Sequence, residues 1–124
     1  MSDSRKKLEW VGAARAELQA FPPLARRRAG MNLDLVQAGL EPDDWKPMGS
    51  VGPGVREIRV RSFDGGATQH RVVYVARFPE AVYVLHAFEK KTEQTPLHNL
   101  RLAAARYRQL VAKRDLADQP WRGR

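Results

Sequence analysis

The chain of 124 residues contains no cysteine, which excludes disulfide bonds and cysteine-based metal sites and suits a reducing compartment. No uninterrupted apolar run approaches the roughly 20 residues that a membrane-spanning helix needs. The N-terminal sequence MSDSRKKLEW also lacks the apolar segment of a secretory signal. We therefore expect a cytoplasmic protein with no membrane partner.

Recognisable catalytic motifs and metal sites are missing as well. The three histidines, His70, His86 and His98, have no close metal-ligand spacing, so we expect no metal and no other cofactor. No HExxH, paired-carboxylate motif or serine–histidine–aspartate order is visible. The glycine-rich stretch 49–54 precedes an expected strand and lacks the helix N-terminus of a phosphate-binding loop. We interpret this stretch as a flexible connector.

Positive charge is what the chain has in excess. Its 22 lysines and arginines against 14 aspartates and glutamates give a formal net charge of +8. This balance predicts attraction to nucleic acid or to an anionic surface, although surplus arginine also serves solubility alone. The length fits one domain with one modest core. We place that domain in residues 1–114 and expect residues 115–124 to form a flexible polar tail.

Hydrophobic periodicity predicts an α+β fold with the order β-α-α-β-β-β-α. A short strand at 6–11 precedes two antiparallel helices, at 12–20 and about 22–38, which the prolines after Phe21 separate and Gly39 ends. Residues 40–53 read as irregular. A mainly antiparallel sheet follows, and then a helix begins at Thr95-Pro96. We expect the helices to cover one face of the sheet.

Three apolar alternating segments form the predicted sheet: VREIRVR, HRVVYVARF and AVYVLHAFEKKT. The turns Asp64-Gly65-Gly66 and Phe78-Pro79-Glu80 join them, so consecutive strands should pair antiparallel. In the third segment, strict alternation gives one face with Val82, Val84, His86 and Phe88 and another with Tyr83, Leu85 and Ala87. We interpret His86 as a hydrogen-bonded core histidine.

The same alternation gathers cations on one face of the sheet. The cations expected to converge there are Arg59, Arg61, Arg71 and one of Lys90 or Lys91. Glu57 shares that face and is expected to hold one arginine through a bidentate pair. Arg56 has the opposite parity, which places it at a strand end or beside a bulge. Like charges on adjacent strands are unfavourable without a compensating ligand, so we favour a phosphate-binding cluster over a merely solvated basic face.

With these strands placed, the chain resembles toxins of the RelE/ParE superfamily, in the phage-derived HigB-like branch. The resembling stretches are WKPMGSVGPGVREIRVR, HRVVYVARF, YVLHAFEKKTEQTP and the closing helix, from about residue 45 to 110. The resemblance implies a RelE-like fold and a toxin of a type II toxin–antitoxin system, inhibited by a cognate antitoxin. It further implies an endoribonuclease that enters the ribosome and cleaves mRNA by attack of the 2′-hydroxyl on the adjacent phosphate, without a metal.

Site residues follow from the resemblance position by position. Arg71 matches the central-strand catalytic arginine, and Lys91 matches a cation just after the last strand. The remaining candidates are Lys90, Arg59 and Arg61 for catalysis and Arg56, Arg77, His98 and Arg106 for RNA binding. The tyrosine or histidine that some members carry near the last helix has no clear counterpart. His98, or a lysine whose pKa neighbouring cations lower, is a candidate general base.

Two other functions remain open at this point. The same fold serves ParE-like poisons of DNA gyrase, which act by binding. A non-catalytic nucleic-acid-binding module would rely on phosphate contacts alone, with a steep salt dependence. The basic strand 55–61 and the segment FEKKT favour the nuclease.

Overall fold

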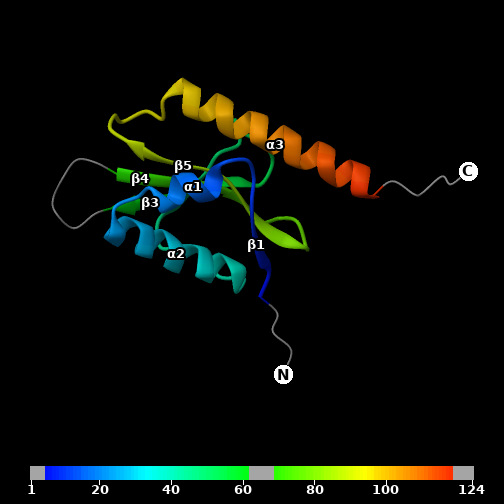
Figure 1. The fold of residues 1–124 in the computed structure, drawn as a ribbon, viewed down its shortest axis with the longest axis horizontal. Coiled ribbons are helices and arrows are strands. Elements are labelled where there is room, and N and C mark those ends of the chain that lie inside the picture. The colour runs from blue at the N-terminus through cyan, green and yellow to red at the C-terminus, as the bar shows by residue number, and fades with distance from the viewer. Residues whose placement is uncertain (1–4, 62–68, 119–124) are drawn as a thin grey trace, which may run out of the picture.

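The computed structural model describes residues 5–61 and 69–118 and has the predicted α+β class. Figure 1 shows the strands passing between α2 and α3. The elements are β1 (Lys7–Trp10), α1 (Ala14–Gln19), α2 (Pro23–Gln37), β2 (Trp45–Pro47), β3 (Val55–Arg61), β4 (Gln69–Val75), β5 (Ala81–Lys90) and α3 (Leu97–Asp118). The predicted turn at Asp64-Gly65-Gly66 lies outside the described residues.

The sheet has the strand order β1-β5-β4-β3-β2. β1 pairs in parallel with β5, and the other three pairings are antiparallel, as expected for a mainly antiparallel sheet. β2 was not predicted, because residues 40–53 read as irregular. Its three residues pair with β3 from Trp45–Ile58 to Pro47–Arg56. Three residues are too few to show an alternating pattern, and a proline is tolerated because β2 is an edge strand.

Helices cover both faces of the sheet, which corrects the expectation of a single covered face. α1 and α2 pack against one face, over a core that includes Ile58, Val72 and Tyr74. α3 packs against the opposite face, over a core that includes Val73 and Leu85. β4 and β5 are apolar on both faces, so the fold must bury both. The helical hairpin, in contrast, was predicted correctly, since α1 and α2 run in opposite directions in Figure 1.

A bulge in β5 changes which side chains share a face. Val73 pairs with His86 while Tyr74 pairs with Val84, so Leu85 is an extra residue in β5. Strict alternation is therefore wrong beyond Val84, because a bulge shifts the phase of all later residues by one. His86 consequently shares a face with Val73, and Ala87 joins the opposite core.

Two glycines determine where neighbouring segments end or pack. Gly39 has φ of +82°, and Leu40 N donates to Leu35 O at 2.9 Å, which ends α2 in a Schellman-type cap as predicted. Gly52 lies against the ring of Tyr107, and a Cβ there would lie 2.5 Å from a ring carbon. Val51 and Gly52 are thus packed beneath α3, whereas the rest of the stretch 49–54, expected to be a flexible connector, is exposed.

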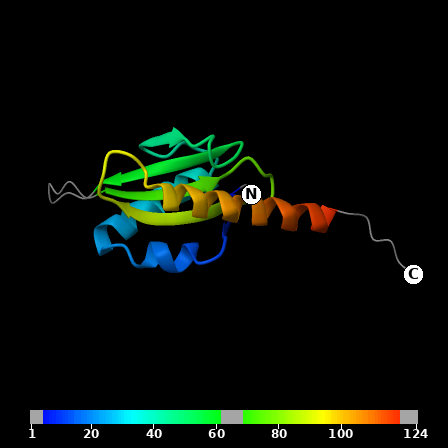
Figure 2. The ribbon, with the colours of Figure 1, turned by 90° about the horizontal axis from the view of Figure 1, so that it is seen from above.

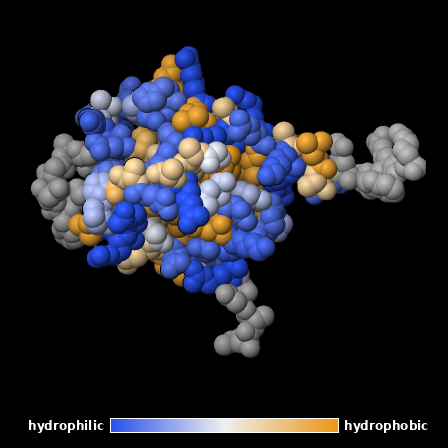
Figure 3. Space-filling view, in the orientation of Figure 1, coloured by the Kyte–Doolittle hydropathy of each residue, from blue (hydrophilic) through white to orange (hydrophobic). Residues whose placement is uncertain are grey.

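α3 begins and ends later than predicted. Asn99 N and Leu100 N donate to Pro96 O, so Pro96 is the N-cap rather than the first helical residue. The helix continues to Asp118, four residues into the segment expected to be a flexible tail. None of the helices within the described ranges combines the length and apolar character needed to cross a bilayer. Hydrophilic residues cover most of the face that Figure 3 shows.

Candidate functional site

Four of the predicted cations share one face of the sheet, on the side that carries α3. The register pairs Arg59 with Arg71, Arg61 with Gln69, and Gln69 with Lys90. Lys46 of β2 joins them, because it pairs with Glu57. We call Lys46, Glu57, Arg59, Arg61, Arg71 and Lys90 the cationic cluster. The predicted convergence on one face is confirmed for Arg59, Arg61, Arg71 and Lys90.

Glu57 is the centre of the cationic cluster and is fully buried. Its Oε1 lies 3.4 Å from Arg71 Nε and 3.7 Å from Lys46 Nζ. The hydroxyl of Thr95, just before α3, donates to Glu57 Oε2 at 3.4 Å. Glu57 therefore holds an arginine as predicted, but through one nitrogen rather than a bidentate pair.

Arg71 is 4 % exposed and only partly satisfied. Its Nη2 donates to Gln69 Oε1 at 2.6 Å, whereas its buried Nε and Nη1 have no hydrogen-bond partner among the described residues. Burial lowers the pKa of Arg71, and Glu57 opposes this effect. Unsatisfied buried donors are costly. Nε faces the carboxylate of Glu57 across 3.4 Å, so Nη1 is the donor of Arg71 for which the described residues supply neither a hydrogen bond nor an ion pair.

Lys90 is the second buried cation of the cluster, at 5 % exposure. Burial, and then repulsion from Arg71 and Lys46, lowers its pKa. Its ammonium forms no ion pair or hydrogen bond with any residue in the described ranges. Lys90 is therefore a largely buried lysine beside other cations, an environment that is common at functional sites.

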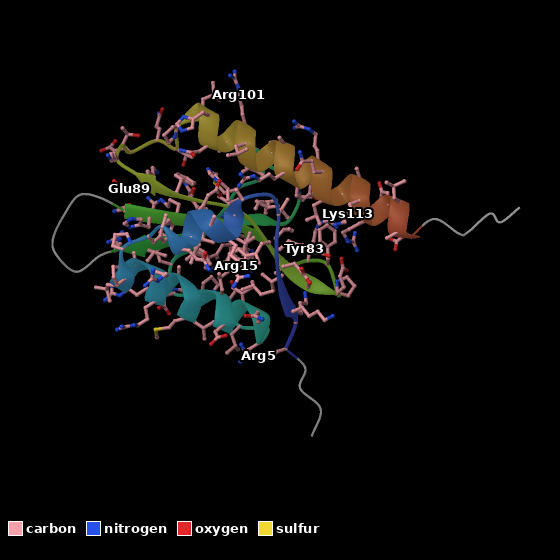
Figure 4. The ribbon with its side chains drawn as sticks, in the orientation of Figure 1. Arg5, Arg15, Tyr83, Glu89, Arg101 and Lys113 are labelled. Atoms are coloured by element: carbon pink, nitrogen blue, oxygen red, sulfur yellow. The ribbon has the colours of Figure 1, made fainter. Side chains whose placement is uncertain are left out.

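Lys91 does not belong to the cationic cluster. It is exposed, and its ammonium lies 3.6 Å from a carboxylate oxygen of Glu89. Glu89, labelled near the end of β5 in Figure 4, pairs with His70 in the register and so lies on the α2 face of the sheet. Of the two predicted alternatives, the register therefore brings Lys90 to the cluster, because the bulge shifts the phase of β5.

Arg59 and Arg61 form the accessible margin of the cluster, with side chains 34 % and 69 % exposed. Asp44 accepts from Arg59 Nε at 3.0 Å and lies 4.0 Å from Arg61 Nη2. The five cations still outnumber the two carboxylates, Glu57 and Asp44. Sequence reasoning missed Lys46, because residues 40–53 were expected to be irregular. Alternation assigns a side chain to a face of the sheet only when the residue lies in a strand.

Three of the predicted RNA contacts are engaged elsewhere in the fold. Arg56 lies on the α2 face of the sheet, where it donates to Glu41 at 2.9 Å and stacks on Trp45. Arg77 donates to Pro53 O and to the Tyr107 hydroxyl, which ties the segment before β3 to α3. His98 is exposed on the first turn of α3.

Arg106 is the third predicted RNA contact that is engaged elsewhere. It belongs to a second buried polar group, which we call the Glu17 network: Glu17, His86, Asn99 and Arg106. Arg106 donates to both carboxylate oxygens of Glu17, at 2.7 and 2.9 Å. His86 lies 2.8 Å from Glu17 Oε1 and 2.7 Å from Asn99 Oδ1, so it is the satisfied core histidine that was predicted. Burial raises the pKa of Glu17, but hydrogen bonds from Arg106 and His86 outweigh this effect and bring the pKa below its ordinary value.

The Glu17 network also closes an edge of the sheet. β1 pairs with β5 only up to Val84, so the second half of β5 has a free edge beside α1, as Figure 2 shows. There Arg106 donates to Leu85 O at 3.0 Å, and Ala87 N donates to Glu17 at 3.3 Å. These contacts satisfy backbone groups that an edge strand leaves unpaired. The role of this network is structural.

No three histidine, aspartate or glutamate side chains within residues 5–61 and 69–118 gather closely enough to hold a metal ion. The chemistry that the cationic cluster offers is instead the binding of an anion. Its guanidinium and ammonium groups can donate to several oxygens of one phosphate at once.

Comparison with known proteins identifies a family. No curated protein matches the chain. The family described as "Phage derived protein Gp49-like (DUF891)" matches residues 16–108. The match runs from α1 into α3 and includes every residue of the cationic cluster, and it covers more than half of the chain. The protein therefore belongs to the Gp49-like family of phage-derived proteins, which is associated with RelE-like toxins.

Proposed function

We propose that the protein is the toxin of a type II toxin–antitoxin system, in the HigB-like branch, and that it cleaves mRNA on the ribosome. The observation that carries this proposal is the excess of cations over carboxylates around Arg71, whose buried Nη1 has no hydrogen-bond partner among the described residues. A phosphodiester supplies the negative oxygens that such a cluster lacks. Family membership supports a toxin-like protein with a cognate antitoxin.

In the proposed reaction, the 2′-oxygen of a ribose attacks the adjacent phosphorus while the bond to the 5′-oxygen breaks. The leaving 5′-oxygen takes up a proton from water, so the products are a 2′,3′-cyclic phosphate and a 5′-hydroxyl. Negative charge grows on the non-bridging oxygens in the transition state, and fixed cations aimed at them lower the barrier. Lys46, Arg59 and Arg61 are exposed enough to contact the RNA. Arg71 acts from behind them, with Glu57 keeping Arg71 in place.

Lys90 is the general base that we propose for this reaction. Its lowered pKa increases the fraction of neutral amine that can take the proton of the 2′-hydroxyl, directly or through one water. The pH–rate profile of Lys90→Arg tests this role, since arginine keeps the charge but stays protonated. We expect a lower rate and an altered profile for Lys90→Arg, and neither for Lys91→Arg. An unchanged profile for both variants would remove Lys90 from the role.

Induction in growing cells tests the proposed function. We expect growth arrest and mRNA fragments whose ends keep a fixed phase to the codons, because cleavage on the ribosome follows the reading frame. The same transcript without a start codon should stay intact. Double-strand breaks in DNA without mRNA ends would instead indicate a gyrase poison. Toxicity with neither change would indicate a non-catalytic nucleic-acid-binding module.

A further inference from the structure

A groove of about 490 Å³ lies between α2, residues 43–44 and the end of β3. α2 forms one wall with Leu24, Arg27, Arg28 and Met31. Arg59 and Arg61 of the cationic cluster form part of the opposite wall. The groove therefore connects the outer face of α2 with the accessible margin of the proposed active site.

Specific hydrogen bonds hold the walls of this groove in place. Asn32 is buried; its amide donates to Arg28 O at 2.9 Å, and its carbonyl accepts from Asp43 N at 2.8 Å. Asp44 O accepts from Arg59 N at 2.8 Å, which fixes residues 43–44 against β3. The groove is thus preformed, which lowers the entropic cost of binding a partner.

The α2 wall exposes two large apolar side chains, Leu24 at 37 % and Met31 at 61 %. They are seven residues apart, two helical turns, so they lie on the same side of α2. Met31 is flexible and polarisable, which suits contact with an apolar partner surface. Arg27 and Arg28 lie between them along the helix.

The rim of the groove is cationic. Four arginines and two aspartates line it, so its formal net charge is +2. Asp44 is engaged by Arg59, whereas Arg27 is exposed and makes no ion pair with any described residue. The groove therefore combines an apolar strip with arginines available for carboxylates.

This combination favours a protein partner over RNA. Single-stranded RNA is bound by stacking its bases on aromatic rings, and none of the described residues that line the groove is aromatic. An amphipathic acidic helix would place apolar side chains on Leu24 and Met31 and carboxylates on Arg27 and Arg61.

We propose that this groove docks an acidic, amphipathic helical segment of the antitoxin. The inference rests on the proposed function, because it names the surface by which that toxin is inhibited. A segment bound there covers Arg59 and Arg61, the accessible margin of the cationic cluster, and so blocks access of RNA to Arg71 and Lys90. Inhibition by this route needs no displacement of α3.

The probe is the product of the open reading frame adjacent to this gene, purified and titrated against the full chain by calorimetry. We expect Met31→Glu and Arg27→Glu each to weaken binding roughly ten- to a hundred-fold. Met31→Glu would bury an unpaired carboxylate in the interface, and Arg27→Glu would repel the acidic segment. The matched controls, Leu116→Glu and Arg101→Glu on exposed positions of α3, should bind as the wild type does. Thermal melts show whether each variant remains folded.

Cleavage of mRNA in a cell-free translation reaction separates this inference from the proposed function. Met31 and Arg27 lie outside the cationic cluster, so both variants should cleave as the wild type does but escape inhibition by the added partner. Equal binding by Met31→Glu, Arg27→Glu and the wild type would overturn the docking inference alone. So would the absence of any complex with the adjacent product. A wild type that binds through α2 but cleaves no mRNA would overturn the proposed function instead.

Discussion

The cationic cluster and the Glu17 network are two buried polar groups that differ in how well they are satisfied. Each places an arginine beside a carboxylate between the sheet and neighbouring segments. In the Glu17 network, Arg106 makes a bidentate pair with Glu17, and both His86 nitrogens have partners. In the cationic cluster, Arg71 leaves Nε and Nη1 without a hydrogen bond, and the Lys90 ammonium forms no ion pair with a described residue.

This difference indicates that the Glu17 network stabilises the fold and that the cationic cluster is the candidate for binding and catalysis. A fully satisfied buried network stabilises one arrangement of the elements around it. A buried cation without a partner costs stability, and a protein keeps it where function requires it. Substitutions at matched positions of the two groups should therefore have opposite consequences.

The largest expected effect is that of Arg71→Ala on activity. We expect the rate of mRNA cleavage in a cell-free translation reaction to fall roughly 100- to 1000-fold, as when a donor to the transition state is removed. The fold should persist, because Lys46 remains 3.7 Å from Glu57. Arg101→Ala, on the exposed side of α3, is the control and should cleave normally. Equal rates for both variants would contradict the proposed role of Arg71.

Arg106→Ala should act on stability. Removing one partner of a buried ion pair leaves Glu17 uncompensated, so we expect the free energy of unfolding to fall by about 3 kcal/mol. Urea denaturation measures this change. Arg108→Ala, exposed on the same helix, should change the free energy by less than about 0.5 kcal/mol. A loss no larger than that of Arg108→Ala would mean that the Glu17 network does not stabilise the fold.

Lys90→Met should stabilise the protein while abolishing cleavage. An apolar side chain of similar length removes a buried charge, so we expect the free energy of unfolding to rise by about 1 kcal/mol near neutral pH. The pKa of Lys90 is lowered from its ordinary value of 10.5, so the unfolded state binds more protons between the two pKa values. Wild-type stability should therefore increase as pH rises through that window, and this increase should be absent from the variant.

Urea denaturation at several pH values measures both effects of Lys90→Met. Lys91→Met is the control, because Lys91 is exposed and should contribute less than about 0.5 kcal/mol. A destabilised Lys90→Met variant would show that the ammonium is satisfied after all and would weaken the contrast between the two groups.

The smallest effect is expected at Glu80, an exposed carboxylate paired with Arg114 at 2.6 Å. Hydrogen bonds from Arg114 and Tyr83 lower the pKa of Glu80 to about 2. The stability this pair contributes is complete above pH 4.5 and is lost as pH falls toward 2. Solvent screening keeps this contribution small. Urea denaturation at several pH values measures this loss. The free energy of unfolding should depend less on pH in that window for Glu80→Gln, whereas Glu93→Gln should show the same pH dependence as the wild type.

Local patterns allowed much of the fold to be predicted from the sequence. Alternation placed Arg59 and Arg71 on one face, and Gly39 ended α2 where a glycine cap was expected. These features depend on residues within one turn or one strand, so residues that are adjacent in the sequence are enough to predict them. The same reasoning recognised His86 as a core histidine from its apolar neighbours.

The errors share a different origin. β2 exists because residues 45–47 pair with β3, and the bulge at Leu85 is visible only in the register between β5 and β4. Arg106 was assigned to RNA binding, yet Glu17, 89 positions earlier, engages it. A local sequence pattern does not predict pairing between segments that are far apart in the chain.

The sequence by itself determined the α+β class, the helical hairpin and the excess of arginine on alternating strand positions, because each follows from composition and short-range periodicity. Only the tertiary structure decided that Lys90 rather than Lys91 joins Arg71, that Lys46 belongs beside Glu57, and that Arg106 pairs with Glu17. The physical reason is that burial and pairing between distant segments set the charge environment of a side chain. A one-residue shift in strand register is enough to move a lysine from one face of the sheet to the other.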